Sequence, residues 1–231
     1  MAEAIRADVF SGRLVEGQRL PPERELAEQF GVSRVVVREA IRALELSGIL
    51  KVRKGAGGGT FVSSRYEKPL GTSISNLLAG GAISLDHLFE MRMLLEPPAA
   101  ELAAKRASDQ QLAELKEIVS RAQGLRTDSK ALRQANLAFH RKLVEMAGNP
   151  LLAALCGTVL DILVRSLEGK LSIETSLAVL GYHEKIVTAL EARDGELARE
   201  LTVGDLQQLA KRYKQLGIEV PAPAAGHPGR A

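Results

Sequence analysis

The sequence predicts a mainly α-helical protein in which a small helix-and-hairpin domain precedes an antiparallel all-helical bundle. Apolar residues recur at helical spacing over most of the 231 residues. Strand-like patterns flank only the glycine-rich loop "KGAGGG" (54–59), and the polar segment "SSRYEKPLG" (63–71) separates this loop from the later helices. The expected divisions are a first domain (1–63), a linker (64–71), a bundle of six or seven helices (72–217) and a disordered tail (218–231).

The first domain begins with three predicted helices. Ile5 and Val9 lie on one face of a first helix that ends near Gly12. Pro21 and Pro22 open the second helix, because the first turn of a helix needs no N–H from these positions.

The third helix and a hairpin complete this domain. Gly31 ends the second helix, and Ser33 is a natural N-cap for a third helix that reaches about Leu46. The segments "ILKVR" (49–53) and "TFVSS" (60–64) then predict two short strands. Two helices joined by a tight glycine turn and followed by a hairpin predict a winged helix-turn-helix.

The excess positive charge of the chain lies in its first third. Residues 1–68 hold 12 Lys/Arg and 9 Asp/Glu, whereas the remainder holds 19 of each. On the third helix Arg34, Arg38 and Arg42 share one face, while the apolar residues opposite them are expected to pack inward: Val37, Ile41, Leu44 and Leu46. This pattern predicts contact with a polyanion, although Arg42 is equally explained as a solvated charge. The low aromatic content of 3%, without Trp, argues against a base-stacking surface for single strands.

The segment "LPPERELAEQFGVSRVVVREAIRALELSGILKVRKGAGGGTFV" (20–62) resembles the DNA-binding domain of GntR-family bacterial transcription regulators. The resemblance implies that the third helix enters the major groove and that the wing tip reaches the minor groove. The residues that it assigns to DNA are Arg24, Ser33, Arg34, Arg38, Lys54 and Gly55. Alternatively, Arg24 forms an ion pair with an acidic residue of its own helix. Glycines 57–59 have the alternative role of a merely flexible turn. Val35 and Val36 depart from the family pattern, which has Thr or Ser there.

The bundle places polar residues on apolar helix faces. Asn136 and His140 are four residues apart on one apolar face, and His183 and Asp205 each interrupt another. Buried polar groups need partners. If the last two helices turn back near Gly195, His183 and Asp205 lie at nearly the same height. The four residues could then form a cluster of N and O donors suited to a Zn, Ni or Mn-type ion, or a metal-free hydrogen-bond network.

Two segments of the bundle, "FHRKLVEMAGNPLLAAL" (139–155) and "YHEKIVTALEARDGELA" (182–198), resemble the FCD effector domain of the FadR-like branch of that family. In many members an Asp and three His bind a metal that helps to hold a carboxylate metabolite. His140 and His183 match two of these positions. Asn136 replaces the usual Asp, and Asp205 replaces the usual third His.

Two arginines of the bundle are candidates for binding the effector, and a pair of prolines is expected to disturb one helix. Arg92 lies on an apolar line and is a candidate clamp for an anionic effector, or else the partner of Glu96. Arg165 is a second effector candidate. The pair Pro97 and Pro98 predicts a kink, or a helix that restarts at Pro97.

These features predict a ligand-responsive transcription regulator, not an enzyme, that binds a pseudo-palindromic operator as a homodimer. The expected effector is a small organic acid. Alternatives are a metal-free pocket for an acyl-CoA, a metalloenzyme with a DNA-binding head, and an architectural DNA binder. The single cysteine, Cys156, and the lack of a signal peptide or of an apolar run near 20 residues predict a cytoplasmic, nucleoid-associated protein without membrane contact.

Overall fold

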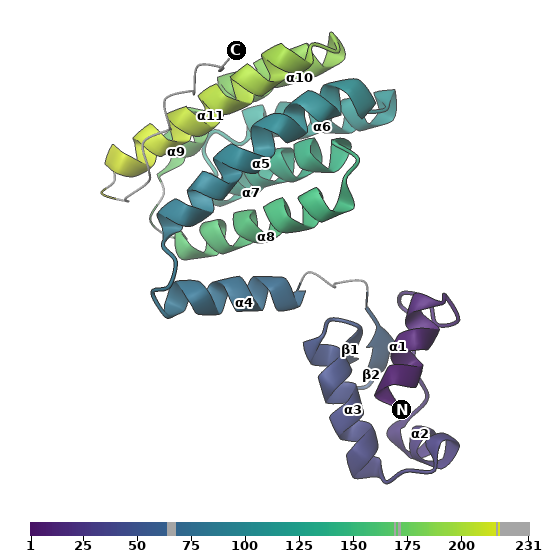
Figure 1. Ribbon diagram of the computed structural model, residues 1–231. Helices are drawn as coiled ribbons and strands as arrows, with labels where there is room; N and C mark the ends of the chain where they lie inside the picture. The colour runs from purple at the N-terminus through teal and green to yellow at the C-terminus, as the bar shows by residue number, and fades with distance from the viewer. Residues whose placement is uncertain (64–67, 169, 171, 216, 218–231) are drawn as a thin grey trace, which may run out of the picture. The chain divides into compact units, whose positions relative to one another are not determined.

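The computed structural model describes residues 1–63, 68–168, 170, 172–215 and 217. It divides into two compact units between Asn76 and Leu77 (Figure 1). The predicted disordered tail (218–231) and residues 64–67 of the predicted linker lie outside the described residues. Each unit is described by itself below.

The N-terminal unit has the predicted helices and hairpin. Its elements are α1 (Ala2–Phe10), α2 (Glu23–Phe30), α3 (Arg34–Leu46), β1 (Leu50–Arg53) and β2 (Gly59–Val62). The strands are antiparallel, with Leu50 opposite Val62 and Arg53 opposite Gly59. The winged helix-turn-helix fold is therefore confirmed.

The predicted turn and cap residues hold α2 and α3 in place. Gly31 ends α2 with a left-handed φ of 62°, a conformation that glycine adopts without steric cost. The Ser33 side chain accepts a hydrogen bond from the Val36 N–H at 3.3 Å and so caps α3. Val37 and Ile41 are buried in the core of this unit.

The glycines of the wing are required by its geometry. A Cβ at Gly58 would lie 2.6 Å from the Arg53 carbonyl oxygen, and one at Gly59 would lie 2.7 Å from Arg19 Nε. The backbone of Arg19 also pairs with that of Phe61 along the outer edge of β2. The alternative of a merely flexible turn at glycines 57–59 is thus corrected at two positions, because a side chain at Gly58 would clash with backbone and Gly59 has a φ of 149°, which side chains rarely adopt.

The predicted linker is partly helical. Helix α4 (Lys68–Ala79) includes residues 68–71, which the sequence analysis assigned to the linker. Pro69 lies in the first turn of α4, where its missing N–H removes no helical hydrogen bond. Proline there favours a helix start, so residues 68–71 of the predicted linker are helical.

The C-terminal unit is a helical bundle in which α5 packs against α7, α8, α10 and α11 (Figure 1). Its helices are α5 (Leu85–Arg106), α6 (Asp109–Gly124), α7 (Ser129–Met146), α8 (Pro150–Ser166), α9 (Ile173–Leu177), α10 (Leu180–Glu191) and α11 (Gly195–Gln215). Helix α5 runs through Pro97 and Pro98, so the expected restart at Pro97 is wrong. None of the helices described is both long enough and apolar enough to cross a membrane.

The α10–α11 hairpin positions the polar residues of the core. Gly204 lies so close to Tyr182 that a Cβ at 204 would be 2.6 Å from Tyr182 Cε1. The next residues along both helices are His183 and Asp205. These two side chains meet across the antiparallel helices, with His183 Nε2 3.7 Å from Asp205 Oδ1, as the turn near Gly195 predicted.

Candidate metal centre and DNA interface

The side chains predicted to bind DNA lie on the surface of the N-terminal unit. Those exposed to solvent are Arg24, Ser33, Arg34, Arg38, Lys54 and Gly55. Arg34 and Arg38 project from the first half of α3, the part of a recognition helix that meets base edges. Both arginines are accessible to a duplex, and their roles on DNA stay predictions.

Arg38 has a partner that the sequence analysis did not identify. Its Nη2 donates to Glu23 Oε2 at 2.9 Å and its Nε to Glu23 Oε1 at 3.3 Å. The hydrogen bond from Arg38 lowers the pKa of Glu23. Glu23 thus holds the guanidinium across the gap between α2 and α3. Arg24 makes an ion pair of 3.8 Å with Glu28, which is the alternative role that the sequence allowed.

Three predicted metal ligands meet in the core of the bundle. His140 on α7, His183 on α10 and Asp205 on α11 are buried, and each offers one ligand atom within 4.8 Å of the others. His140 Nε2 lies 3.5 Å from Asp205 Oδ2, and His183 Nε2 lies 3.7 Å from Asp205 Oδ1. Ligand atoms about 2.1 Å from a tetrahedral ion are about 3.4 Å apart. The observed spacing therefore fits a shared divalent ion.

The hydrogen bonding of this cluster also fits a metal. His183 Nε2 and both carboxylate oxygens of Asp205 are buried without a hydrogen-bond partner among the described residues. Such atoms are costly to bury, and a coordinated cation would satisfy them. The metal-free alternative requires hydrogen bonds between these groups, and their distances exceed hydrogen-bond length.

Charge in the cluster is tuned by burial. Burial lowers the pKa of His183 well below its usual range, and the charges of His140 and Arg92 add to this effect. His183 is therefore a neutral imidazole, the form that binds metal. Burial raises the pKa of Asp205 to about 6, although His140 and Arg92 oppose this shift. The Asp205 carboxylate is thus poorly stabilised by the protein alone.

Glu96 on α5 supports the cluster from behind. Its Oε2 lies 2.7 Å from His140 Nδ1, although the N–H direction departs from hydrogen-bond geometry. Burial would raise the pKa of Glu96, but Arg92 and His140 lower it to about 2. An anionic carboxylate at Nδ1 leaves Nε2 of His140 to face Asp205. Carboxylates behind metal-binding histidines commonly have this orienting role.

Stacking fixes the second imidazole. The ring of Phe139 lies on that of His183 with centroids 3.8 Å apart and an interplanar angle of 14°. Phe139 precedes His140 on α7, so one helix supplies a candidate ligand and the support for another. The stacking thus orients the His183 ring without a polar side chain.

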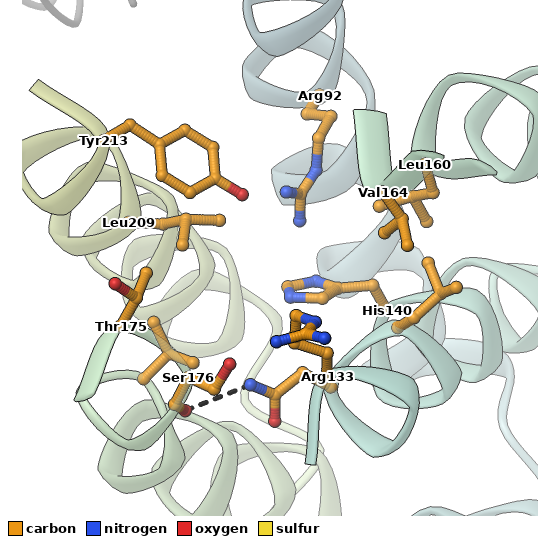
Figure 2. Close-up of a pocket in the computed structure, with 12 residues that line it drawn as sticks. Arg92, Arg133, His140, Leu160, Val164, Thr175, Ser176, Leu209 and Tyr213 are labelled. Carbon is orange, nitrogen blue, oxygen red and sulfur yellow. Dashed lines mark hydrogen bonds between the residues drawn. The ribbon is translucent and has the colours of Figure 1, made fainter. Parts of the chain in front are cut away.

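A cavity adjoins the cluster. Its volume is about 60 Å³, which is room for a few waters. Figure 2 shows Arg92, His140 and Arg133 along one wall, with Thr175 and Ser176 facing them. His140, a candidate metal ligand, thus lines the same cavity as guanidinium and hydroxyl groups.

Arg92 lines this cavity but is already paired. Its Nε lies 2.6 Å from Glu96 Oε1 and its Nη2 lies 3.3 Å from Glu96 Oε2, with both side chains buried. The pairing that the sequence left as an alternative is therefore present. Its charge is largely compensated, which weakens the prediction that Arg92 alone binds an anionic effector.

Arg165 does not line the cavity. It is exposed in the last turn of α8, and its Nε donates to the Asp161 carbonyl oxygen at 3.2 Å. Leu160 and Val164, four residues apart, face the cavity instead. Arg165 follows Val164 by one residue and points about 100° away, so its assignment to the effector is corrected.

Asn136 lines the cavity one turn before His140. Its Nδ2 donates to the Ser176 carbonyl oxygen at 3.0 Å (Figure 2). Its Oδ1 is buried without a hydrogen-bond partner among the described residues. The amide thus presents an acceptor oxygen, and its role as a fourth metal ligand stays a prediction.

Comparison with known proteins places both units in one family. Residues 1–62 match the family model described as "Bacterial regulatory proteins, gntR family", and residues 87–208 match the "FCD domain" model. The HTH-type transcriptional repressor NanR of Salmonella newport is 30% identical over 213 residues, which cover 87% of this chain and 79% of that protein. The chain belongs to the GntR family of bacterial regulators.

Other relatives of this GntR-family regulator agree. The Uxu operon regulator of Haemophilus influenzae is 34% identical over 155 residues, which cover 67% of this chain and 56% of that protein. The solved structure of a GntR protein from Streptococcus agalactiae superposes with a TM-score of 0.71 at 29% identity, covering 91% of this chain and 97% of that one. The chain is a DNA-binding transcription regulator with an FCD domain and not an enzyme, so the metalloenzyme alternative is rejected.

The sequence analysis missed several residues of the FCD site. Glu96 was considered only as a partner for Arg92, although it lies one turn away on the same face of α5. Arg133 precedes Asn136 by three residues, and this spacing could have placed it on the same face. Thr175 and Ser176 carry no such signal, because the short helix α9 has too few residues to show a periodicity.

Proposed function

We propose that a small organic acid, held beside a divalent metal ion in the FCD cavity, controls the binding of this regulator to operator DNA. The observation that carries the proposal is the set of buried, unsatisfied ligand atoms on His183 and Asp205 next to a cavity lined by arginine. The proposed ligands are His140, His183 and Asp205, with Asn136 as the fourth. Nitrogen and oxygen donors of this kind suit Zn, Ni or Mn-type ions. A bound ion would offer the effector carboxylate a positive centre.

The cavity favours a small acid over an acyl-CoA. A cavity of about 60 Å³ matches a short carboxylic acid more closely than a nucleotide with an acyl chain. Arg133 lines the cavity and donates a hydrogen bond from Nη1 to the Ser129 hydroxyl at 2.5 Å, so its guanidinium lies at the cavity wall. We assign the effector carboxylate to Arg133 and the metal, and effector hydroxyl groups to Thr175 and Ser176.

Two copies of the chain would bind one operator. Each α3 would occupy a major-groove half-site, and two-fold symmetry would require a pseudo-palindromic sequence. An effector that prefers one arrangement of the two heads shifts the population of DNA-competent dimers. Because the Salmonella relative is named a repressor, we propose that this protein represses its targets in the cytoplasm and that the acid releases it.

Metal analysis tests the centre directly. We expect about one divalent ion per chain in protein purified without chelator, and none in the His183→Ala variant. At an ion concentration about 100 times Kd, removal of the ion costs about 2.7 kcal/mol, which is a fall in Tm of about 5–10 °C. His87→Ala, an exposed histidine outside the cluster, serves as the control and keeps its ion. Ion-free wild-type protein would disprove the metal centre.

Thermal shift with two- to six-carbon carboxylic acids, and with their neutral amides as controls, tests the effector. We expect an acid to raise Tm and to weaken operator binding, and its amide to do neither. The Arg133→Gln variant should lose this response and keep the metal. A response only to acyl-CoA compounds would disprove the small-acid assignment while leaving the metal centre intact.

A further inference from the structure

Two apolar side chains stand exposed at the start of the recognition helix α3. Val35 is 69% exposed and Val36 is 48% exposed, whereas the next residue, Val37, is fully buried. Arg34 precedes them and Arg38 follows within one turn. This apolar patch, formed by Val35 and Val36, therefore lies within the face proposed to meet DNA.

The position of Val35 on the helix is decisive. Val37, Ile41 and Leu44 define the direction in which α3 packs into its domain. At 100° per residue, Val35 lies within about 30° of the opposite direction. Val35 thus projects away from the core, and Arg38, three residues later, lies about 60° around the helix from it.

Folding gives no reason for valine at these two positions. Val35 and Val36 are largely uncovered, so their burial in the domain core contributes little. Valine is also a weaker helix former than alanine or lysine, because its branched Cβ restricts rotation against the preceding turn. Scattered exposed valines are common, but these two lie in the first turns of the helix proposed to meet DNA, between Arg34 and Arg38 in the sequence.

The chemistry of valine limits what it can recognise in DNA. Its side chain has no hydrogen-bond donor or acceptor, so it bonds neither to phosphate nor to the polar edge of a base. The apolar group that a standard base pair offers in the major groove is the C5-methyl of thymine. The arginines on either side bring the helix to the duplex, and guanine is their preferred base.

We propose that Val35 contacts the C5-methyl group of a thymine in each operator half-site, next to a guanine bound by Arg34 or Arg38, with Val36 bordering the contact. This inference rests on the operator binding proposed above and specifies part of the sequence recognised. It predicts a preference for a T·A pair at a fixed position, set by a methyl group and not by hydrogen bonds.

Replacing single thymines by uracil tests the contact, because uracil lacks only the methyl group. The operator is first obtained by selecting the full-length protein against random duplexes. We then expect one thymine per half-site whose replacement weakens binding about fourfold, and about fifteenfold when both half-sites are changed. Binding is measured by fluorescence anisotropy at one salt concentration, since affinity for DNA depends strongly on salt.

The Val35→Ala variant tests the same contact from the side of the protein. It should fold normally, because the side chain is exposed and alanine favours helix more than valine does. We expect it to bind thymine and uracil duplexes equally. Leu46→Ala, which removes an exposed apolar side chain near the other end of α3, should keep the full preference for thymine.

The possible results separate the two levels of the inference. Uracil duplexes that bind as tightly as thymine duplexes would overturn the methyl contact and leave operator binding standing. A thymine preference that persists in Val35→Ala would overturn the role of Val35. Selection that enriches no sequence would overturn operator recognition and the contact with it.

Discussion

The N-terminal domain and the bundle each contain an arginine held by a glutamate through two contacts, and the two pairs differ in exposure. The Arg38 and Glu23 side chains are 62% and 33% exposed, whereas those of Arg92 and Glu96 are 4% and 0% exposed. Exposed pairs contribute little stability and break easily. Buried pairs are costly to disrupt, because the remaining charge has no water. Arg38 can therefore leave Glu23 and contact DNA, whereas Arg92 and Glu96 stay fixed beside the cavity.

Removing one partner of the buried pair should produce the largest effect. In Glu96→Gln the Arg92 guanidinium stays buried without a counter-charge, so we expect the free energy of unfolding to fall by about 3–5 kcal/mol. Urea denaturation measures this change. The control is Lys105→Gln, which breaks the exposed Glu101–Lys105 pair at the same spacing on the same helix and should change stability very little.

A double variant distinguishes the effect of the unpaired Arg92 charge from general misfolding of Glu96→Gln. Replacing both partners, as in Arg92→Met with Glu96→Met, removes the unpaired charge and should recover most of the lost stability. Equal stability of the single variant and the wild type would show that the pair does not fix this part of the core.

Acid should weaken the same pair. Burial opposes ionisation of Glu96, but Arg92 and His140 hold its pKa at about 2, below the ordinary value of 4.5. A lowered pKa contributes stability that is complete above about pH 4.5 and is lost as the pH falls toward 2. Unfolding measured between pH 5 and pH 2 should show this loss in the wild type and a shallower slope in Glu96→Gln.

In the N-terminal domain, truncation of an arginine should affect binding and not folding. We expect Arg38→Ala to weaken specific operator binding about tenfold to a hundredfold while Tm stays within the error of measurement. The comparison is with Arg42→Ala on the same helix, which should lose far less. An unchanged footprint and affinity in Arg38→Ala would remove this arginine from the readout.

The smallest expected effect concerns Glu23. Because Arg38 lowers its pKa, Glu23 is ionised at neutral pH and adds negative charge beside the DNA-binding face. We expect Glu23→Gln to release Arg38 and to tighten operator binding about twofold to fivefold. Glu28→Gln, on the same helix beside Arg24, controls for the change in net charge. Weaker binding in Glu23→Gln would mean instead that the pair orients Arg38 for its base.

The two domains also differ in how much could be predicted from sequence. The N-terminal domain is built from local signals: Gly31 and Ser33 mark the turn, and glycines mark the wing. Each of these determines backbone within a few residues of itself. The predicted helices, hairpin and exposed arginines were therefore confirmed, whereas the Arg38–Glu23 pair, which joins residues 15 apart on different helices, was not foreseen.

In the bundle, sequence spacing predicted the ligands better than the cavity. His183 and Asp205 were placed together correctly, because two helices joined by a short turn have a fixed register. The cavity wall depends on which faces of α7, α8 and α9 meet, and no local pattern specifies that. Arg165 was therefore assigned wrongly, and Arg133 with Thr175 and Ser176 was missed.

The contact between Gly204 and Tyr182 lies beside the candidate ligands, and a substitution there replaces none of them. A methyl group at position 204 would press on the Tyr182 ring; position 204 adjoins Asp205 on α11, and Tyr182 adjoins His183 on α10. Substitution of a residue with no side chain would thus change the spacing of His183 and Asp205 while leaving every donor atom chemically unchanged.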